Sequence, residues 1–197
     1  MKKLFIGTRN PKKLYELSQI LGSEYDLLSF KDIDIQEVEE TEETLEGNAI
    51  LKAKSYFQQT HLPCIADDTG LMVDILNGEP GIWSARYAGE PADSQKNIQK
   101  LLEKLRHLNA LTPSERKAHF KTVIAYYDGS EVHTFEGIIH GYIALEPQGN
   151  NGFGYDPVFI PEGYTSTFAQ MSNEQKNLIS HRNIALQKFK NFITLHS

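Results

Sequence analysis

Apolar residues follow one another along the chain in two patterns, one typical of strands and one typical of helices. Short apolar or alternating runs predict strands at residues 3–8, 25–35, 64–66, 120–127 and 132–143. Two further runs, residues 71–76 and 82–87, flank an Asn-Gly-Glu-Pro-Gly turn and predict a hairpin. The last two strands are joined by a turn at Asp128 and Gly129.

Apolar residues at helical spacing predict four long helices, each of which begins at a capping residue. The caps are Asn10, Thr44, either Asp93 or Ser94, and Ser172. The helix after Thr44 is expected over residues 45–59, and the one after Ser172 continues to near the C-terminus. The apolar stripe of this last helix comprises Leu178, Ala185, Leu186, Phe189 and Ile193. Residues 112–115 have capping-box spacing and predict one more short helix.

Composition narrows the class of protein. A chain of 197 residues fits one domain, at most two, and is long enough for a sizeable core. Its net charge of −6 argues against non-specific nucleic-acid binding. A single cysteine excludes a disulfide framework and fits a reducing compartment. The N-terminal apolar run is too short for a signal peptide, and no membrane span is predicted.

Two adjacent carboxylates, Asp67 and Asp68, follow the apolar run at residues 64–66. Because Thr69 and Gly70 come next, the pattern predicts a buried strand that ends in a turn and delivers both acids to a sheet edge. Neighbouring acids repel, so at least one needs a cation, a donor or a raised pKa. The pair is a candidate metal or general-base site, and an Asp-rich turn that caps its own backbone is the alternative.

Residues 8–13, Thr-Arg-Asn-Pro-Lys-Lys, place two lysines in the first turn of a helix. Cations oppose the helix dipole there, and an anion over the helix N-terminus would resolve the conflict because free N–H groups and lysines converge on it. The segment is therefore a candidate phosphate site, although its spacing is not that of a P-loop. Two solvated surface lysines are the alternative interpretation.

Five glutamates, at positions 37, 39, 40, 42 and 43, precede the second helix. Such a run is usually a solvated face, but Mg²⁺ also takes one or two protein carboxylates together with substrate phosphates. On the helix itself, Asn48 and Lys52 lie at the margin of an apolar arc formed by Leu45, Ala49, Ala53 and Tyr56. Lys52 either snorkels to solvent or reaches into a cleft toward phosphate.

Two features near the C-terminus suit a ligand. Residues 149–157, Gly-Asn-Asn-Gly-Phe-Gly-Tyr-Asp-Pro, predict no regular element. Their glycines permit close backbone approach, and Phe153 and Tyr155 offer flat faces to a base unless the rings are tucked into the core. In the last helix Arg182 projects into the apolar stripe, beside His181 and downstream of Lys176. A buried guanidinium needs partners, which an acceptor-rich ligand or a buried acid would supply.

Seven segments resemble, in order, the motifs of the inosine/xanthosine triphosphate pyrophosphatases, the family that acts on non-standard purine nucleoside triphosphates. They are TRNPKK (8–13), EET (39–41), EGNAILKA (46–53), ADDTGL (66–71), PGIWSARY (80–87), GFGYDP (152–157) and SHR (180–182). The resemblance covers nearly the whole chain. It departs at Arg9, where the family commonly has glycine, and at Gly47, where glutamate is frequent.

The resemblance implies an α/β fold with a long, twisted mixed β-sheet flanked by helices, and two lobes with an active-site cleft between them. It implies one domain over residues 1–197 that works as a homodimer in the cytoplasm, with no nucleic acid or membrane as partner. The expected reaction is Mg²⁺-dependent hydrolysis of a small-molecule substrate, ITP, dITP or XTP, to the monophosphate and pyrophosphate.

The resemblance also assigns the site residues. Asp68 would be the general base and, with Glu40, a ligand of Mg²⁺. The substrate would be bound by Thr8, Arg9, Asn10, Pro11, Lys12, Lys13, Lys52, Thr69, Phe153, Gly154, Tyr155, Asp156, Lys176, His181 and Arg182. Donors from His181 and Arg182 fit the 6-oxo group of hypoxanthine or xanthine, and they meet the 6-amino group of adenine donor to donor.

Two other classes of protein compete with this interpretation. A nucleotide-binding module would have the same pocket with a misplaced base, and release of pyrophosphate from ITP separates it from an enzyme. A structural protein would merely pair its acidic and basic clusters with each other. Thermal stabilisation by ITP with Mg²⁺ separates that class, since only a binder shifts the melting point.

Overall fold

The computed structural model describes residues 2–21 and 25–195. The chain divides into two compact units. Unit 1 comprises Met1–Asp68, Thr122–Gly137 and Arg182–Ser197, and unit 2 comprises Thr69–Lys121 and Ile138–His181. These units correspond to the two lobes that the resemblance implies, whereas a cleft between them stays a prediction.

A mixed seven-stranded sheet forms the framework within the described residues, in the order β2-β1-β3-β5-β6-β7, with β4 paired to β3. The strands are β1 (Lys2–Ile6), β2 (Tyr25–Leu28), β3 (Cys64–Val73), β4 (Pro80–Gly81), β5 (Lys117–Tyr127), β6 (Val132–Ile143) and β7 (Phe159–Pro161). β1 pairs in parallel with β2 and β3, whereas the β3–β4 and β6–β7 pairs are antiparallel. The predicted α/β fold with a mixed sheet is confirmed.

Four of the five described helices begin where the capping residues predict. The helices are α1 (Pro11–Leu21), α2 (Leu45–Thr60), α3 (Ser94–His107), α4 (Asn173–Ile179) and α5 (His181–Leu195), with 3-10 turns η2 (Asp74–Leu76), η3 (Ser84–Arg86) and η4 (Phe168–Gln170). Thr44 Oγ1 accepts from the amide of Gly47, and Asp93 caps α3 in the same way. Among residues 2–21 and 25–195, no helix is long and apolar enough to cross a bilayer.

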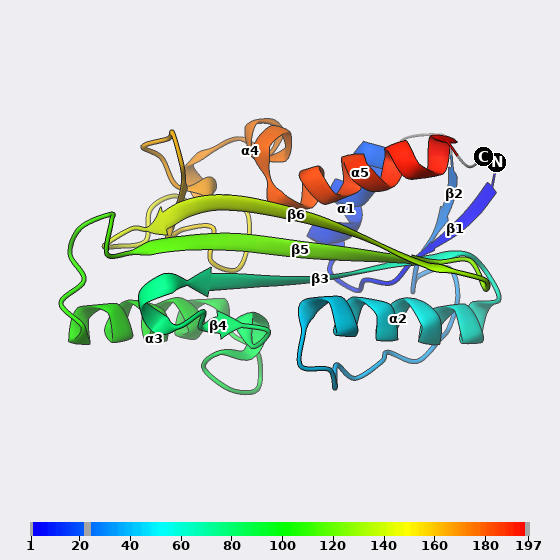
Figure 1. The fold of residues 1–197 in the computed structure, drawn as a ribbon, viewed down its shortest axis with the longest axis horizontal. Coiled ribbons are helices and arrows are strands. Elements are labelled where there is room, and N and C mark those ends of the chain that lie inside the picture. Colours follow the sequence, from blue (N-terminus) through cyan, green and yellow to red (C-terminus); the bar gives the residue numbers. More distant parts are fainter. Residues whose placement is uncertain (1, 22–24, 196–197) are drawn as a thin grey trace. The chain divides into compact units, whose positions relative to one another are not determined.

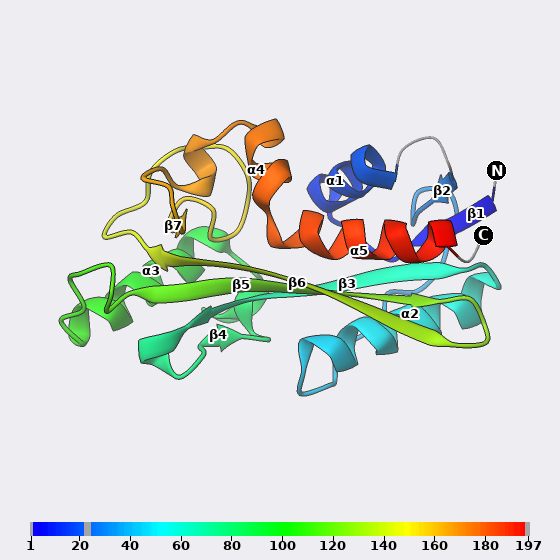
Figure 2. The ribbon, with the colours of Figure 1, turned by 45° about the horizontal axis from the view of Figure 1, so that its top comes forward.

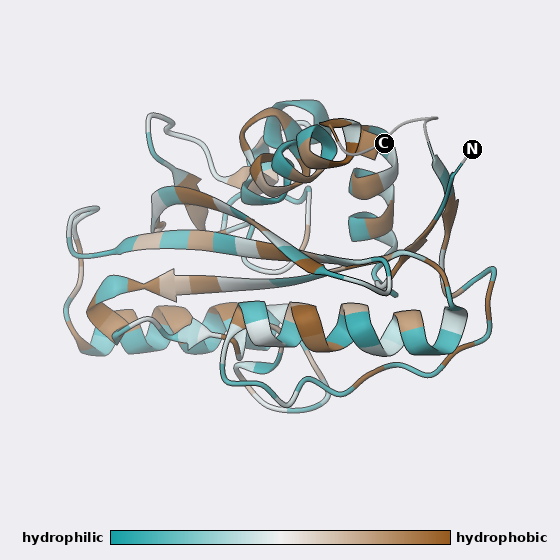
Figure 3. Ribbon diagram, turned by 45° about the vertical axis from the view of Figure 1, so that its right-hand side comes forward, coloured by the Kyte–Doolittle hydropathy of each residue, from teal (hydrophilic) through white to brown (hydrophobic). Residues whose placement is uncertain are grey.

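In unit 1, α1 and α5 lie on one side of the strands and α2 lies on the other (Figures 1 and 2). Leu17 of α1 and Phe189 of α5 share one hydrophobic cluster with Ile65 of β3. On the opposite side, Tyr56 of α2 packs its ring 5.8 Å from that of Phe5. Hydrophilic and hydrophobic bands alternate along α2 (Figure 3), as expected of a helix with one buried face.

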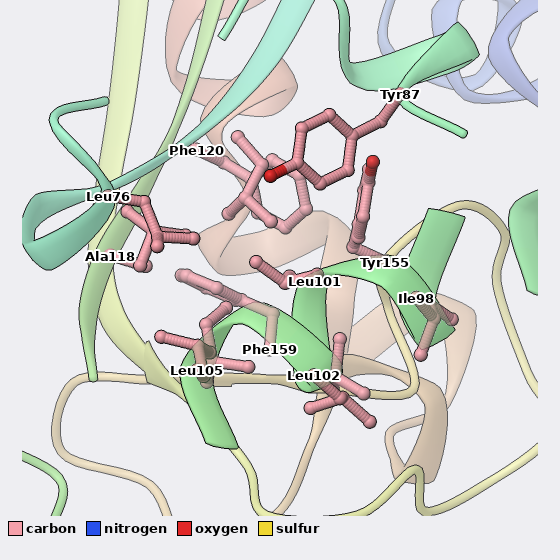
Figure 4. Close-up of a cluster of buried hydrophobic side chains, with 14 of the residues drawn as sticks. Leu76, Tyr87, Ile98, Leu101, Leu102, Leu105, Ala118, Phe120, Tyr155 and Phe159 are labelled. Atoms are coloured by element: carbon pink, nitrogen blue, oxygen red, sulfur yellow. The ribbon is translucent and has the colours of Figure 1, made fainter. Parts of the chain in front are cut away.

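In unit 2, the apolar face of α3 packs against aromatic residues of β5 and β7 (Figure 4). Leu101 and Leu105 are fully buried in this cluster. The rings of Phe120 and Phe159 meet edge to face with centroids 4.7 Å apart. This core supports the loop of residues 149–157, which has no regular secondary structure, as predicted.

The strand that carries the two adjacent acids is longer than predicted. β3 runs from Cys64 to Val73, so Asp67 and Asp68 lie inside a strand and not in a turn after it. Leu71 pairs with Gly81 of β4 and extends the strand beyond the acids. The prediction of a strand end, and the alternative of an Asp-rich turn, are both wrong because tertiary partners satisfy the buried carboxylates.

Three other local predictions need correction. Residues 112–115 form a turn and no helix, because the Glu115 carboxylate accepts from the amides of Leu111 and Thr112 and β5 begins at Lys117. Residues 82–87 contain η3, so the second strand of the hairpin is only Pro80–Gly81. The strand expected over residues 25–35 ends at Leu28, where Asp32 Oδ2 accepts from the Ser29 amide and closes a turn.

The predicted last helix is broken in two. Ser180 has an extended conformation, with φ −68° and ψ 150°, and separates α4 from α5. The break changes the rotational phase, so Leu178 is 77% exposed whereas Leu186 of α5 is fully buried. The assignment of Leu178 to the apolar stripe is therefore wrong, while Ala185, Leu186, Phe189 and Ile193 are buried as predicted.

Two substitutions of leucine by alanine test this break. Leu186→Ala is expected to lower the free energy of unfolding by about 3 kcal/mol, because a buried leucine leaves a cavity. Leu178→Ala is expected to change it by less than about 0.5 kcal/mol, since the side chain is exposed. Urea unfolding measures both values. Equal losses in the two variants would mean that Leu178 belongs to the core.

Candidate active site

The ammonium group of Lys52 lies among three oxygen atoms of unit 1. Its Nζ is 2.7 Å from Glu40 Oε1, 2.7 Å from the carbonyl oxygen of Asp67 and 3.8 Å from Asp68 Oδ1. Burial alone would lower the pKa of Lys52, but Asp68, Glu40 and Asp67 outweigh it and raise the pKa above its usual value. Lys52 is therefore a buried, charged side chain, and the snorkelling alternative is wrong.

Asp67 and Asp68 point to opposite sides of β3, as successive residues of a strand do. Asp67 Oδ2 accepts from Lys13 of α1 at 2.8 Å. Asp68 Oδ2 accepts from Asn48 of α2 at 3.2 Å. Since α1 and α2 cover opposite sides of the strands in unit 1, the two neighbouring carboxylates face different surroundings (Figure 1).

The two surroundings shift the pKa values of Asp67 and Asp68 in opposite directions. Burial raises the pKa of Asp68 to about 6, and the charges of Glu40 and Asp67 add to the shift although Lys52 opposes it. Burial would also raise the pKa of Asp67, but Lys13, Arg182 and Lys52 together lower it well below its usual value. Asp67 therefore stays ionised, whereas the pKa of Asp68 lies closer to neutral pH.

Arg182 joins this acidic cluster in unit 1. Its Nη1 donates to Glu16 Oε2, and its Nε lies 3.7 Å from Asp67 Oδ2. The guanidinium is buried, so the two acids compensate a charge that is costly to bury alone. Sequence reasoning expected a buried acid or a ligand as partner, and it missed that Glu16 is that acid. The available signal was an acidic residue next to the apolar positions Leu14 and Leu17 of α1.

The predicted phosphate segment, residues 8–13, forms the entry to α1. Asn10 is the helix cap: its Oδ1 accepts from the amides of Lys12 at 3.0 Å and Lys13 at 3.3 Å, and Thr8 Oγ1 accepts from the Asn10 amide at 3.2 Å. These amides therefore donate within the protein, which differs from the predicted set of free N–H groups. Pro11 is the first residue of the helix, as expected.

Arg9, which replaces the usual glycine, contacts the loop that leads to Glu40. Its guanidinium lies 4.3 Å from the centre of the Phe30 ring and 3.3 Å from Glu37 Oε2, and it donates to the carbonyl oxygen of Ile35 at 3.4 Å. The side chain thus binds the acidic loop of this chain.

A second polar cluster lies in unit 2, in the loop of residues 149–157. Asp156 Oδ2 accepts from Lys176 Nζ at 2.7 Å and from the Phe153 amide at 2.8 Å. The Lys176 ammonium also lies 4.7 Å from the centre of the Phe153 ring. Gly152, at φ +74°, is required here because a Cβ would come within 2.0 Å of Asp156 Oδ2. The structure therefore brings together three predicted site residues, Phe153, Asp156 and Lys176.

The remaining predicted residues of unit 2 differ in exposure. His181 is buried and stacks on Phe120, with ring centroids 4.7 Å apart and planes 13° apart. The Tyr155 ring lies in the hydrophobic core and its hydroxyl donates to the carbonyl oxygen of Ser84 at 2.8 Å, as the tucked-ring alternative expected. Thr69 follows Asp68 on β3 and is half-buried, and Gly154 has φ +60°.

The donor set near Lys52 suits a hard cation. Glu40 and Asp68 both supply carboxylate oxygens. The two groups lie close enough that one cationic atom, Lys52 Nζ, is within 3.8 Å of an oxygen of each. In the part of the chain that the structure describes, no three His, Cys, Asp or Glu side chains gather into a metal-binding group. Two carboxylates are the usual protein contribution to a Mg²⁺ ion that also binds substrate phosphates.

Comparisons with known proteins agree with the motifs. Residues 4–192 match the model of the Ham1 family. The chain is 49% identical over 194 residues to the dITP/XTP pyrophosphatase of Porphyromonas gingivalis, and 43% identical over 196 residues to that of Bacillus subtilis, with 98% of both chains covered in each case. The resemblance that the seven motifs indicate is confirmed.

Solved structures agree as well. The Ham1 protein of Staphylococcus aureus has a TM-score of 0.88 at 40% identity, with 100% of both chains covered. A HAM1 protein from Coxiella burnetii has a TM-score of 0.90 at 37% identity, covering 98% of this chain and 99% of that one. The fold is therefore shared over the full length of these chains.

The opposite pKa shifts of the two acids predict opposite effects of pH on stability in metal-free buffer. A raised carboxyl pKa means that the stability of the wild type falls as pH rises from about 4 to about 6, and this contribution should be absent in Asp68→Asn. A lowered pKa contributes stability above about pH 4, so Asp67→Asn should destabilise the protein by about 3 kcal/mol at pH 7.5.

Urea unfolding with EDTA, at pH 7.5 and again at pH 5, checks both expectations. The loss of stability between pH 5 and pH 7.5 that the raised pKa of Asp68 causes in the wild type should disappear in Asp68→Asn. An unchanged pH dependence in Asp68→Asn would contradict the assignment of the raised pKa to Asp68.

Proposed function

Because the chain belongs to the Ham1 family, we propose that it hydrolyses the non-standard purine nucleoside triphosphates ITP, dITP and XTP to the monophosphate and pyrophosphate. Relatives named dITP/XTP pyrophosphatase match 98% of its length, which supports the reaction and the substrate class. The observation that carries the proposal is the buried Lys52 ammonium between Glu40 and Asp68, beside a carboxyl of raised pKa. Such an enzyme keeps deaminated purines out of DNA and RNA.

The proposed catalytic residue is Asp68. Attack of water on the α-phosphorus needs a base that holds the proton of the attacking water. Without metal the carboxyl has a pKa of about 6 and is therefore mostly ionised at neutral pH, as a base must be. Asn48 donates to its Oδ2, which fixes the orientation of the carboxylate toward Lys52.

Lys13 and Lys52 would neutralise part of the negative charge of the triphosphate. Both ammonium groups are held by acids of unit 1, Lys13 by Asp67 and Lys52 by Glu40, so they are oriented before substrate binds. Asp67 stays ionised and therefore keeps Lys13 in place. Thr8, Arg9, Asn10, Pro11 and Lys12 are proposed to line the same phosphate site.

We propose that Glu40 and Asp68 also bind Mg²⁺. When bound, the metal would neutralise part of the triphosphate charge and polarise the phosphate that is attacked. The two carboxylates offer the oxygen donors that this ion prefers. Lys52, which contacts both carboxylates, would then be available to the phosphates.

Base recognition is proposed for Thr69, the loop of residues 153–156, Lys176, His181 and Arg182. Hypoxanthine and xanthine carry a 6-oxo acceptor, which suits donors from His181 and Arg182, whereas adenine presents a donor there. The Asp156–Lys176 pair and the ring of Phe153 support this assignment, because they combine hydrogen-bonding groups with a flat face. A homodimer and a cytoplasmic location remain predictions of the resemblance.

The proposed reaction is tested by a panel of all common and deaminated nucleoside triphosphates, with and without Mg²⁺. Pyrophosphate release is expected from ITP, dITP and XTP with Mg²⁺, and ATP should be a poor substrate. Asp68→Asn should remain folded and lose about 10³-fold or more in kcat, since it removes the base. Release of orthophosphate in place of pyrophosphate, or full activity of Asp68→Asn, would contradict the proposal.

Base readout by Arg182 has its own test. Arg182→Ala is expected to raise KM for ITP more than it slows ATP hydrolysis, because the lost donor serves the 6-oxo group. Steady-state kinetics with both substrates measures the difference. Equal losses on ITP and ATP would instead mean that Arg182 acts through its contacts with Glu16 and Asp67.

A further inference from the structure

The segment of residues 36–42, here called the acidic segment, is bound along α2 at four successive places. Side chains of α2 contact every second residue of the segment. The contacts are Gln59 with Gln36, Tyr56 with Val38, Lys52 with Glu40, and Asn48 with Glu42. The segment therefore runs antiparallel to the helix, although it has no regular secondary structure itself.

The spacing of these contacts explains why the segment stays on the helix. Positions 48, 52, 56 and 59 are separated by three or four residues, so they lie on one face of α2. The contacts recur at every second residue of the segment and at each turn of α2, so one face of the helix binds the segment along its length.

Three of the four contacts hold the main chain of the segment. Gln59 Oε1 accepts from the Gln36 amide at 2.8 Å and Gln59 Nε2 donates to the Gln36 carbonyl at 3.1 Å. Asn48 Oδ1 accepts from the Glu42 amide at 2.9 Å, and Tyr56 Oη accepts from the Val38 amide at 3.5 Å. Only at Glu40 is the contact made by the segment's own side chain. The backbone is thus fixed on both sides of Glu40, whose carboxylate accepts from Lys52.

Arg9 holds the start of the segment from another direction. It donates to the carbonyl oxygen of Ile35 and pairs with Glu37, the two neighbours of Gln36. Gln36 therefore contacts α2, while its two neighbours contact Arg9. The first residues of the acidic segment are thus held by α2 on one side and by Arg9 on the other.

We propose that Gln59 is a positioning residue for Glu40: by holding the backbone of Gln36 it fixes the acidic segment and thereby sets the affinity of the site for Mg²⁺. Gln59 contacts the segment four residues before Glu40, so it acts through the backbone. The inference rests on the proposed function, because it assumes that Glu40 is a ligand of the metal. Neither the family motifs nor the cluster around Lys52 includes this glutamine.

The test compares Gln59→Ala with two matched controls. Gln58→Ala removes the neighbouring exposed glutamine of α2, and Gln36→Ala leaves the backbone groups that Gln59 contacts. Gln59→Glu retains the acceptor for the Gln36 amide and serves as the conservative variant. Hydrogen–deuterium exchange of residues 36–42 is measured on each protein alone, together with Mn²⁺ binding followed by EPR. The Mg²⁺ dependence of pyrophosphate release from ITP is then measured.

Loss of two hydrogen bonds should raise exchange in the acidic segment about tenfold in Gln59→Ala and weaken Mn²⁺ binding about three- to tenfold. The Mg²⁺ concentration for half-maximal activity should rise by the same factor, while kcat at saturating Mg²⁺ changes less than about twofold. Gln59→Glu should fall between wild type and Gln59→Ala, and both controls should match wild type.

Unchanged metal affinity in Gln59→Ala, despite faster exchange, would overturn the inference, as would equal effects in Gln36→Ala. A fall in kcat at saturating Mg²⁺ with no change in metal dependence would also overturn it. If the wild-type protein released no pyrophosphate, the proposed function would fail separately. Exchange and Mn²⁺ binding would still decide the positioning role, since both are measured without substrate.

Discussion

The buried ammonium of Lys52 is the interaction on which the candidate site depends. An isolated charge in a protein interior costs several kcal/mol, and the cost is offset only when partners surround it. Here the partners come from the acidic segment, from the main chain of β3 and from the side chain of Asp68. One charge on α2 therefore links the acidic segment to β3 within unit 1.

The pleat of β3 separates two roles that are adjacent in sequence. Asp67 faces Lys13 and Arg182, stays ionised and organises cations. Asp68 faces Asn48 and Lys52 and has a pKa raised to about 6. The strand assigns each acid to one side, and the difference in chemistry follows from the alternation of side chains.

Sequence reasoning succeeded where the cause of a structure is local. Asn10, Thr44, Asp93 and Ser172 each cap a helix, because a capping side chain acts on amides two or three residues away. The same reasoning failed where distant residues decide. The Glu115 carboxylate accepts a hydrogen bond typical of a helix cap, but no helix follows because β5 begins at Lys117.

The site shows the same division. The motifs marked Glu40, Lys52 and Asp68, which the structure brings together around one ammonium. Glu16 lies outside every motif, and its pairing with Arg182 joins residues 166 positions apart, which no local pattern predicts. The break at Ser180 was also missed, because apolar positions on both sides of it were assigned to one stripe, whereas Ser180 is extended and Leu178 is exposed.

The order of the chain has a consequence for biosynthesis. Unit 2 consists of Thr69–Lys121 and Ile138–His181, so all of it has been translated before the first residue of α5 that belongs to unit 1. Translation of unit 1 starts earlier than that of unit 2 but ends later, and its core is complete only when Leu186 and Phe189 of α5 have been added. Glu16 and Asp67 are translated long before Arg182, so the buried ion pairs that join them to Arg182 form only after the start of α5 has been synthesised.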